Sequence, residues 1–228
     1  MKSLLLLHGA LGSAVQLAPL AEALRGHYDL HLLGLPGHGG TPAGPEGFSI
    51  PAFAGFVEHY ISEKGLAQPA VFGYSMGGYV ALHLAAMRPG LLGSIVTLAS
   101  KLDWTPEGAA REVKGLQPDL IGQKVPAFAA ALRERHHPLD WKEVLGNTAA
   151  LMLELGRAPL LTPEVLSALA LPVLLLVGDR DNLVTLSETQ EAFRLIPGAQ
   201  LGVLPATPHP LEKVDASFLA AHVRRFVG

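Results

Sequence analysis

Short continuous runs of apolar residues alternate, over the first hundred positions, with segments whose apolar residues recur at helical spacing. The apolar runs predict buried strands, and the amphipathic segments between them predict helices. The predicted strands lie at residues 3–7, 28–33, 69–72 and 93–99. The predicted helices lie at residues 16–25, 49–61 and 79–87. This alternation predicts an α/β fold with a mostly parallel sheet, helices on both faces and right-handed crossovers.

The alternation stops after Ser100 and resumes near Val173. Between them, from about 101 to 170, only helical segments and helix-breaking residues follow one another. Four helices are predicted there, beginning at residues 105, 126, 140 and 162, and Asp140 with Glu143 has the spacing of a capping box. Roughly seventy residues are more than an ordinary loop needs. We therefore expect one α/β domain over residues 1–228, interrupted by a helical cap over the carboxyl edge of its sheet.

The last part of the chain returns to the first pattern. Residues 173–177 and 200–204 are predicted strands, with a helix at 187–196 between them and a last helix from Asp215 to about Phe226. The sheet is therefore expected to continue on the far side of the insertion.

Composition excludes several classes of function. With 49% hydrophobic and 16% charged residues among 228, the chain is globular, and a net charge of −3 without a basic cluster argues against nucleic acid. The absence of cysteine excludes disulfides, a thiolate nucleophile and a thiolate metal site. No stretch reaches membrane-spanning length, and the leucine run before His8 is too short for a signal peptide. The compartment stays open, but nothing argues for export, and we expect a cytoplasmic protein.

One short stretch links a predicted strand directly to a predicted helix: Gly73-Tyr74-Ser75-Met76-Gly77-Gly78. A serine in such a sharp turn has a strained backbone, and the crowding around it requires that Gly73 and Gly77 lack side chains. The turn raises the Ser75 hydroxyl to the carboxyl end of the sheet. The N-terminus of the following helix points toward it and favours an anionic intermediate. Ser75 is therefore a candidate nucleophile.

Open α/β sheets place their sites outside the carboxyl ends of the strands. The loops expected there carry His8-Gly9-Ala10, Ser75, Asp103, Asp179-Arg180-Asp181 and His209. A reactive serine needs a base, a carboxylate that orients the base, and backbone donors for the oxyanion. Held between two prolines in a loop after the last strand, His209 suits the position of a fixed base.

The remaining histidines have plainer interpretations. His136 and His137 are adjacent at a helix end, so we expect them to diverge into solvent rather than share a metal ion. His8 and His38 are expected to brace glycine-containing loops by hydrogen bonds. Surface positions or satisfied boundary positions are expected for His27, His59, His83 and His222. We therefore expect no metal site, and nothing in the chain indicates a cofactor.

Five motifs in this order resemble the α/β-hydrolase superfamily over essentially the whole chain. They are Leu7-His8-Gly9, Leu35-Pro36-Gly37-His38-Gly39, the stretch around Ser75, Gly178-Asp179-Arg180-Asp181, and the late His209. The resemblance implies Ser75 as nucleophile, Asp181 as acid and His209 as base. It also implies an oxyanion hole made by the backbone N–H groups of Ala10 and Met76.

Two features depart from the family pattern. The two antiparallel strands that usually open the sheet are absent, and Pro208 replaces the glycine that usually precedes the catalytic histidine. Neither departure removes a catalytic group.

The acid is the triad member with competing candidates. We favour Asp181, at the position where most members of the superfamily carry it. Asp179, beside Arg180, is more typical of an ion-paired turn residue. Asp103 follows the fourth strand, where some relatives place their acid.

The resemblance implies a serine hydrolase that acts on a small carboxylic ester through an acyl-enzyme on Ser75. Serine in place of aspartate argues against the haloalkane dehalogenase and epoxide hydrolase branches. Two alternatives stay open: a carbon–carbon bond hydrolase or lyase with the same triad, and a ligand-binding module with a vestigial one. The expected partner is a small-molecule substrate, with no nucleic acid and no membrane, and the oligomeric state stays open. Trp104 and Trp141, in the insertion, would either line the substrate pocket or anchor the cap.

Overall fold

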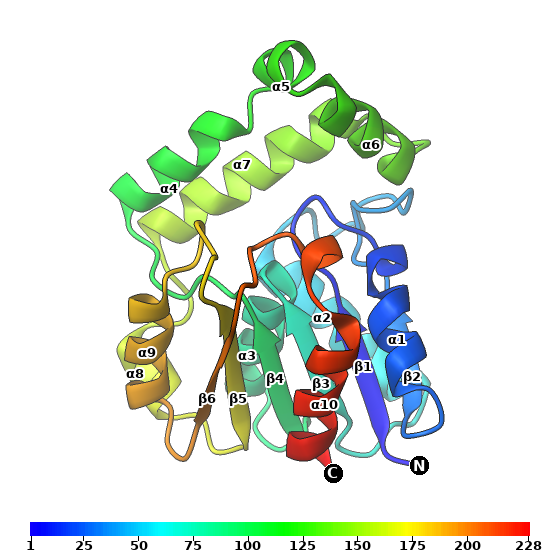
Figure 1. Ribbon diagram of the computed structural model, residues 1–228, viewed down its shortest axis with the longest axis vertical. Coiled ribbons are helices and arrows are strands. Elements are labelled where there is room, and N and C mark those ends of the chain that lie inside the picture. The colour runs from blue at the N-terminus through cyan, green and yellow to red at the C-terminus, as the bar shows by residue number, and fades with distance from the viewer.

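The computed structural model describes residues 1–228, which form one six-stranded sheet flanked by helices (Figure 1). The strands are β1 (Ser3–Leu7), β2 (Asp29–Leu33), β3 (Ala70–Tyr74), β4 (Ser94–Leu98), β5 (Val173–Gly178) and β6 (Gln200–Leu204). Their order in the sheet is β2-β1-β3-β4-β5-β6, and every neighbouring pair is parallel. Each strand lies within two residues of its predicted position, and the predicted fold class is confirmed.

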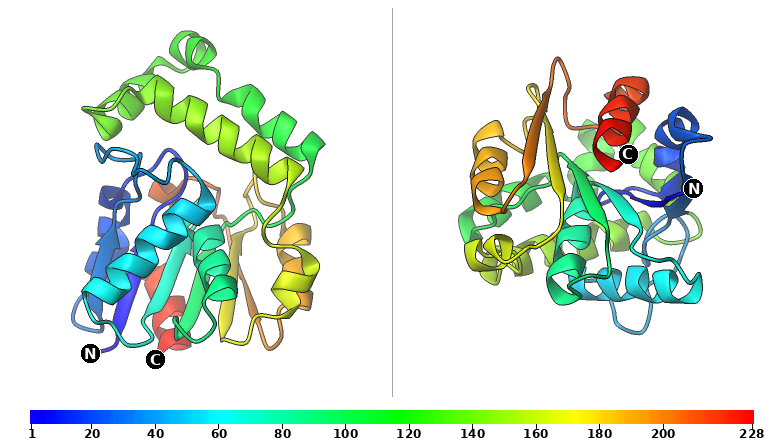
Figure 2. Two further views of the ribbon diagram at one scale, coloured as in Figure 1. Left: turned by 180° about the vertical axis from the view of Figure 1, so that it is seen from behind. Right: turned by 90° about the horizontal axis from the view of Figure 1, so that it is seen from below.

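Helices cover both faces of the sheet (Figure 2). One face carries α1 (Ala18–Leu24) and α10 (Ala216–Val227); the other carries α2 (Ile50–Glu63), α3 (Met76–Met87), α8 (Pro163–Ser167) and α9 (Leu186–Leu195). Strand β1 shows why its apolar run is continuous: Leu4 and Leu6 are buried toward α1 and α10, while Leu5 and Leu7 are buried toward α2 and α3. Covering both faces removes the need for a polar side.

Polar side chains define several helix starts, as predicted. The Ser49 hydroxyl accepts a hydrogen bond from the N–H of Ala52, 3.2 Å away, at the start of α2. Asp140 caps α7 (Trp141–Arg157) by accepting from the N–H of Lys142 at 2.9 Å. The predicted capping box with Glu143 is not formed, because Asp140 bonds the second N–H of the helix and not the third. Short 3₁₀ helices complete the chain: η1 (Ala14–Leu17), η2 (Val113–Gly115) and η3 (Leu211–Lys213).

Four helices between β4 and β5 lie beyond the carboxyl ends of the strands (Figure 1). These inserted helices are α4 (Pro106–Glu112), α5 (Pro118–Lys124), α6 (Pro126–His136) and α7. Helix α5 was not predicted; it begins at a proline and has no capping side chain. In contrast to the predicted cap range, α8 packs against α9 beside the sheet, so the residues from about 160 onward do not lie over the edge.

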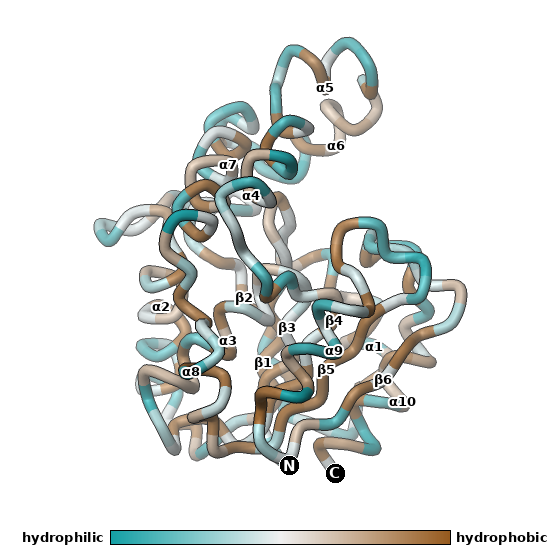
Figure 3. Tube along the Cα trace, turned by 90° about the vertical axis from the view of Figure 1, so that its left-hand side faces the viewer, coloured by the Kyte–Doolittle hydropathy of each residue, from teal (hydrophilic) through white to brown (hydrophobic).

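The inserted helices have a small core of their own. It consists of Ile121, Ala129, Leu132, Trp141 and Leu145, and it is separate from the two clusters that flank the sheet. Hydropathy follows the same division, with hydrophobic strands in the centre and many hydrophilic positions along the inserted helices (Figure 3). No helix in the structure combines the length and the apolar character needed to cross a membrane.

Candidate active site

Ser75 sits in the sharp turn between β3 and α3 that the sequence predicted. Its φ of 50° lies in the left-handed region, which a side chain other than glycine rarely adopts. A Cβ atom on Gly73 would lie 2.4 Å from the nitrogen of Gly78, and one on Gly77 would lie 2.6 Å from the carbonyl oxygen of Leu7. Both glycines are therefore required by close backbone approach. The turn is held in place where the Ser75 carbonyl accepts the Ser100 hydroxyl at 2.8 Å.

His209 and Asp181 form a buried pair at the same edge of the sheet. The distance from His209 Nδ1 to Asp181 Oδ2 is 2.8 Å, and only 13% of the histidine side chain and 1% of the carboxylate are exposed. The other carboxylate oxygen accepts the N–H groups of Leu183 at 2.9 Å and Val184 at 2.8 Å. These contacts come from the loop after β5 and the loop after β6, which are neighbouring strands.

Electrostatics determine which atom of the pair carries the proton. Burial raises the pKa of Asp181, but the hydrogen bond from His209 and those from the Val184 and Leu183 amides outweigh burial, and the net pKa lies below the ordinary value. An ionised carboxylate can only accept, so Nδ1 of His209 is the donor. The lone pair of Nε2 is then free to accept a proton.

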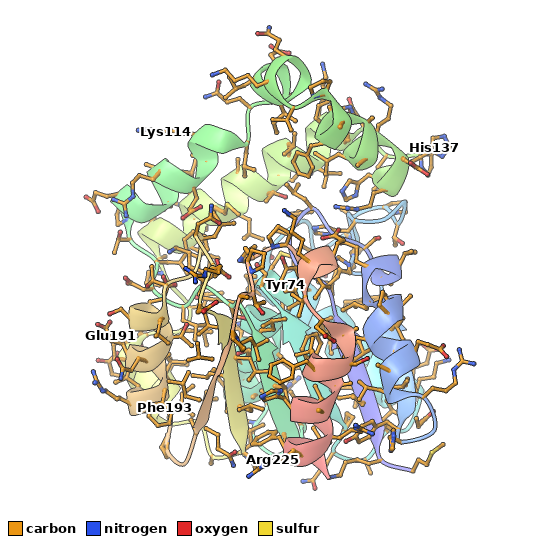
Figure 4. All side chains as sticks on the ribbon, viewed as in Figure 1. Tyr74, Lys114, His137, Glu191, Phe193 and Arg225 are labelled. Atoms are coloured by element: carbon orange, nitrogen blue, oxygen red, sulfur yellow. The ribbon has the colours of Figure 1, made fainter.

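Tyr74 joins the nucleophile turn to the loop that carries the histidine. Its hydroxyl donates to the carbonyl oxygen of His209 at 2.8 Å, and the two rings lie 5.5 Å apart. Burial raises the pKa of Tyr74, followed by the negative charges of Glu212 and Asp181, so the hydroxyl stays protonated as a donor. Figure 4 labels Tyr74 at the upper end of the sheet, below the inserted helices. This role of Tyr74 was not predicted, because its position next to Ser75 is the only signal of it in the sequence.

The Ser75 hydroxyl itself makes no hydrogen bond in this structure, either to His209 or to another group. In enzymes of this kind the bond between nucleophile and base commonly tightens when substrate binds.

The other two candidate carboxylates do not contact His209. Asp179 accepts the N–H of Thr207 at 3.3 Å and lies 3.9 Å from Arg180. Asp103 is exposed at the rim of a separate cavity of about 230 Å³ between the β4 loop and α9. Of the three aspartates, the structure pairs Asp181 alone with the histidine.

The loop after β1 lies against the Ser75 turn. A Cβ on Gly9 would lie 2.9 Å from the Tyr74 ring and 3.1 Å from the Cβ of Ser75. In this loop the N–H of Ala10 donates to no carbonyl group of the protein. Met76 is the first residue of α3, where a backbone N–H has no partner within the helix. Neither of these N–H groups, the two predicted oxyanion donors, has a backbone acceptor in the structure.

His8 and His38 brace the loops that carry them, as predicted. Nδ1 of His8 donates to the Gly9 carbonyl at 2.8 Å, and Nε2 accepts the N–H of Leu35 at 3.0 Å. Nδ1 of His38 donates to the Pro36 carbonyl at 3.1 Å, while its Nε2 has no partner. Burial lowers the pKa of His8 to about 4 and that of His38 to about 3, so both rings are neutral near pH 7.

The prediction for His136 is wrong. Its ring is fully buried: Nδ1 accepts the N–H of Gly39 at 3.1 Å, and Nε2 lies 3.2 Å from the Leu11 carbonyl, to which it donates. His137 is exposed, as expected, at the end of α6 (Figure 4). His136 differs because it meets residues about a hundred positions away, a contact that helical spacing cannot show.

His83 is a second correction. It was expected at the surface or in a satisfied boundary position, but it is 7% exposed and makes no hydrogen bond. Burial lowers its pKa. No group of three or more histidine, aspartate or glutamate side chains in the structure is arranged to hold a metal ion.

The two tryptophans have packing contacts in different places. Trp141 is 6% exposed within the core of the inserted helices. Trp104 packs against the larger cluster beside the sheet, and its indole N–H donates to the Lys101 carbonyl at 3.1 Å. Each tryptophan also borders a cavity, Trp141 one beside α5 and α6 and Trp104 the one near Asp103, but neither cavity includes Ser75 or His209. The contacts therefore favour anchoring over the lining of a substrate pocket for both residues.

Comparison with known proteins places this geometry in a family. The family model of the alpha/beta hydrolase fold matches residues 2–211. A pimeloyl-[acyl-carrier protein] methyl ester esterase of Xanthomonas campestris pv. campestris is 30% identical over 248 aligned positions, covering 99% of this chain and 94% of the relative. One of Xylella fastidiosa is 33% identical, covering 90% and 86%.

Solved structures agree on the fold. NosK from Streptomyces actuosus superposes with a TM-score of 0.83 at 23% identity, covering 99% of this chain and 96% of NosK. A thermophilic esterase from Thermogutta terrifontis reaches 0.77 at 22% identity, covering 100% and 89%. The chain therefore belongs to the alpha/beta hydrolase fold family, as a hydrolase of the esterase type.

Proposed function

We propose that this protein hydrolyses small carboxylic esters through an acyl-enzyme on Ser75, with His209 as base and Asp181 as the orienting acid. The observation that carries the proposal is the buried hydrogen bond from His209 to Asp181, at the sheet edge where the strained turn presents Ser75. A structural ion pair would not require a serine with left-handed backbone beside it. Strain of this kind is typical of sites where geometry serves a reaction.

In the first half of the reaction, Ser75 Oγ attacks the ester carbonyl carbon while Nε2 of His209 takes the hydroxyl proton. The carbonyl π electrons move onto oxygen, and the N–H groups of Ala10 and Met76 stabilise the oxyanion, each by roughly 2.7–4 kcal/mol. Asp181 stabilises the histidine cation and holds its tautomer. When the oxyanion collapses, the bond to the alkoxy group breaks and His209 returns the proton to the leaving alcohol.

The second half repeats these steps with water. His209 takes a proton from the water as its oxygen attacks the acyl carbon. The acid leaves and Ser75 regains its proton from His209, so the enzyme is restored without a cofactor.

The inserted helices are the natural candidate for a cap. They lie beyond the carboxyl ends of the strands, where Ser75 and His209 also lie (Figure 1). We assign them the role of limiting substrate size and water access. The relatives are named for methyl ester hydrolysis, so methyl esters of medium-length acids are the first substrates to test.

The test combines a substrate series with active-site labelling. Methyl and p-nitrophenyl esters of graded acyl length should be hydrolysed, and a fluorophosphonate probe should modify the protein once, on Ser75, as located by mass spectrometry. A vinylogous diketone cleaved faster than any ester would point to carbon–carbon bond hydrolysis. A protein that ignores both esters and probe would contradict the proposal and favour a ligand-binding module.

A further inference from the structure

The end of α6 forms hydrogen bonds with the loop that carries Ala10. The carbonyl oxygen of Leu11 accepts two hydrogen bonds from consecutive residues of this helix. Nη1 of Arg135 donates at 2.8 Å and Nε2 of His136 donates at 3.2 Å. These are contacts between the inserted helices and the β1 loop, across 124 and 125 positions of sequence. Leu11 directly follows the residue whose N–H is a proposed oxyanion donor.

The backbone of Leu11 needs such support. Its φ of 56° is left-handed, a conformation that is unfavourable for a residue with a Cβ. The turn is closed by a hydrogen bond from the Gly12 N–H to the Gly9 carbonyl at 3.1 Å. The Leu11 side chain packs against the small core of the inserted helices. Both the carbonyl and the side chain of Leu11 are thus held from the inserted helices, while His8 holds the other end of the turn through the Gly9 carbonyl.

Arg135 also reaches the loop behind the catalytic histidine. Its Nη2 lies 3.2 Å from Oε1 of Glu212, which stands three residues after His209. Gln16, just after the turn, donates to the same carboxylate oxygen. One guanidinium group therefore bridges the loop of the proposed oxyanion donor and the loop of the proposed base. A planar fork can hold two such acceptors at a set distance, which a lysine cannot do.

We propose that Arg135 is a positioning residue, which acts through Leu11 to hold the Ala10 N–H toward the developing oxyanion. This inference rests on the proposed esterase function. Because the turn from Gly9 to Gly12 is a closed hydrogen-bonded unit, a tilt of its Leu11 carbonyl also tilts the Ala10 N–H. The effect belongs to the transition state, where the oxyanion carries its charge, and not to ground-state binding.

The experiment compares Arg135→Gln with Arg133→Gln. Arg133 lies on the same helix, is exposed and makes no side-chain hydrogen bond or ion pair, so its variant is the matched control. Loss of a full oxyanion donor costs about 10²–10³ in kcat. A misaligned donor should cost less, about 10- to 100-fold in kcat with little change in KM. The inhibition constant of a trifluoromethyl ketone, whose adduct carries an oxyanion, should increase by the same factor.

Two further measurements separate positioning from mere anchoring. Rates are expressed per titrated active site, so unfolded protein does not count. Arg135→Lys, which can still donate to the Leu11 carbonyl but cannot fork, should recover part of kcat. If Arg135→Gln lowers the melting temperature while kcat per site and the ketone constant stay at wild-type values, the inference is overturned.

Hydrogen exchange keeps this result distinct from failure of the proposed function. The Gly12 amide should exchange faster in Arg135→Gln than in wild type or Arg133→Gln, whether or not the protein hydrolyses esters. Unchanged exchange at Gly12 contradicts the hold on the turn even if the esterase assays succeed. If the wild-type protein shows neither ester hydrolysis nor probe labelling, the turn has no catalytic role and the positioning role of Arg135 is refuted.

Discussion

The layers around the sheet and the inserted helices differ in the size of their hydrophobic cores. The two clusters beside the sheet contain 29 and 20 buried residues, while the inserted helices have a cluster of 5. A core of that size cannot stabilise four helices alone. The inserted helices therefore depend on contacts with the main layers. Leu151 and Leu155 of α7 belong to the larger cluster beside the sheet, and Arg135 and His136 of α6 bond the Leu11 carbonyl.

This difference explains where the strained and the adjustable parts of the site lie. The left-handed Ser75 and the buried Asp181 rest on strand ends, where a large core can hold an unfavourable conformation or charge. The inserted helices have few buried apolar contacts of their own, so we expect a lower local stability there. Elements that move in a reaction usually belong to such regions. In the proposed mechanism the sheet thus places the reacting groups, and the inserted helices adjust their alignment.

Ser75→Ala is the strongest test of the sheet-borne half. Removing the hydroxyl should lower kcat by about 10⁶, the loss found when a serine nucleophile is removed in a well-studied protease. The melting temperature should change little, because the hydroxyl makes no hydrogen bond and alanine bears the same strain. Ser62→Ala, an exposed serine of α2, is the control for both measurements. Residual activity within tenfold of wild type would mean that another group is the nucleophile.

Asp181→Asn should have the next largest effect. An asparagine at this position favours the wrong imidazole tautomer, and kcat should fall by roughly 10⁴. Asp179→Asn and Asp103→Asn are the matched controls, since neither side chain contacts His209, and each should cost less than tenfold. A crippled Asp103→Asn with a near-normal Asp181→Asn would reverse the assignment of the acid.

Most of this sheet-borne half could be predicted from the sequence, for physical reasons. A strand buried on both faces must be apolar throughout, so the run from Leu4 to Leu7 marks itself. A Cβ on Gly73 would lie 2.4 Å from the backbone nitrogen of Gly78, so only glycine fits there, and Gly73 therefore identifies the turn around Ser75 in the sequence. Local rules of this kind depend on few residues and leave a clear pattern.

The insertion was less predictable because its structure depends on distant partners. His136 was expected in solvent, but its burial comes from Gly39 and Leu11, which no local pattern connects to it. Helix α5 lacks a capping side chain, so Pro118 is the main sequence signal at its start. The end of the predicted cap was also misplaced, since whether α8 packs over the edge or beside α9 depends on tertiary contacts.

Trp141→Ala would sharpen the contrast between the two regions. Deleting a buried tryptophan costs about 3–5 kcal/mol, and here the loss falls on a cluster of five residues. Amides of α5, α6 and α7 should exchange faster while those of β3 and α3 stay protected. Phe72→Ala, at a fully buried position of β3, should instead lower the protection of the whole molecule. Equal loss of protection everywhere in both variants would show one cooperative unit and remove the contrast.

Lowering the pH should destabilise the contacts between the sheet layers and the inserted helices. This is the smallest of the expected effects. His8, His38 and His136 gather there, with rings 5.2 Å apart for the first two and 6.1 Å for the last two. Burial lowers the pKa of all three, to about 4 for His8 and about 3 for His38. Neighbouring histidines lower the pKa of His8 and His38 further, and Arg135 lowers that of His8 and His136.

The direction of the acid effect follows from these depressed values. Histidines in the unfolded chain titrate near ~6.5, so below that pH the unfolded chain binds more protons than the folded protein. The free energy of unfolding therefore decreases as the pH is lowered from ~6.5 to the folded pKa. His8 should contribute up to about 1.4 kcal/mol per pH unit between pH ~6.5 and about 4, and the lowered pKa values of His38 and His136 act in the same direction. Urea unfolding at pH 7, 6 and 5 measures this slope, and His59→Gln, an exposed position on α2, should leave it unchanged. His136→Gln, which keeps a donor or acceptor for Leu11 or Gly39 without the titration, should reduce the slope even if it lowers stability at pH 7. If His136→Gln leaves the dependence of unfolding free energy on pH unchanged, the acid-sensitive contacts lie within the sheet layers alone. The contacts between the two regions would then not be the acid-sensitive ones.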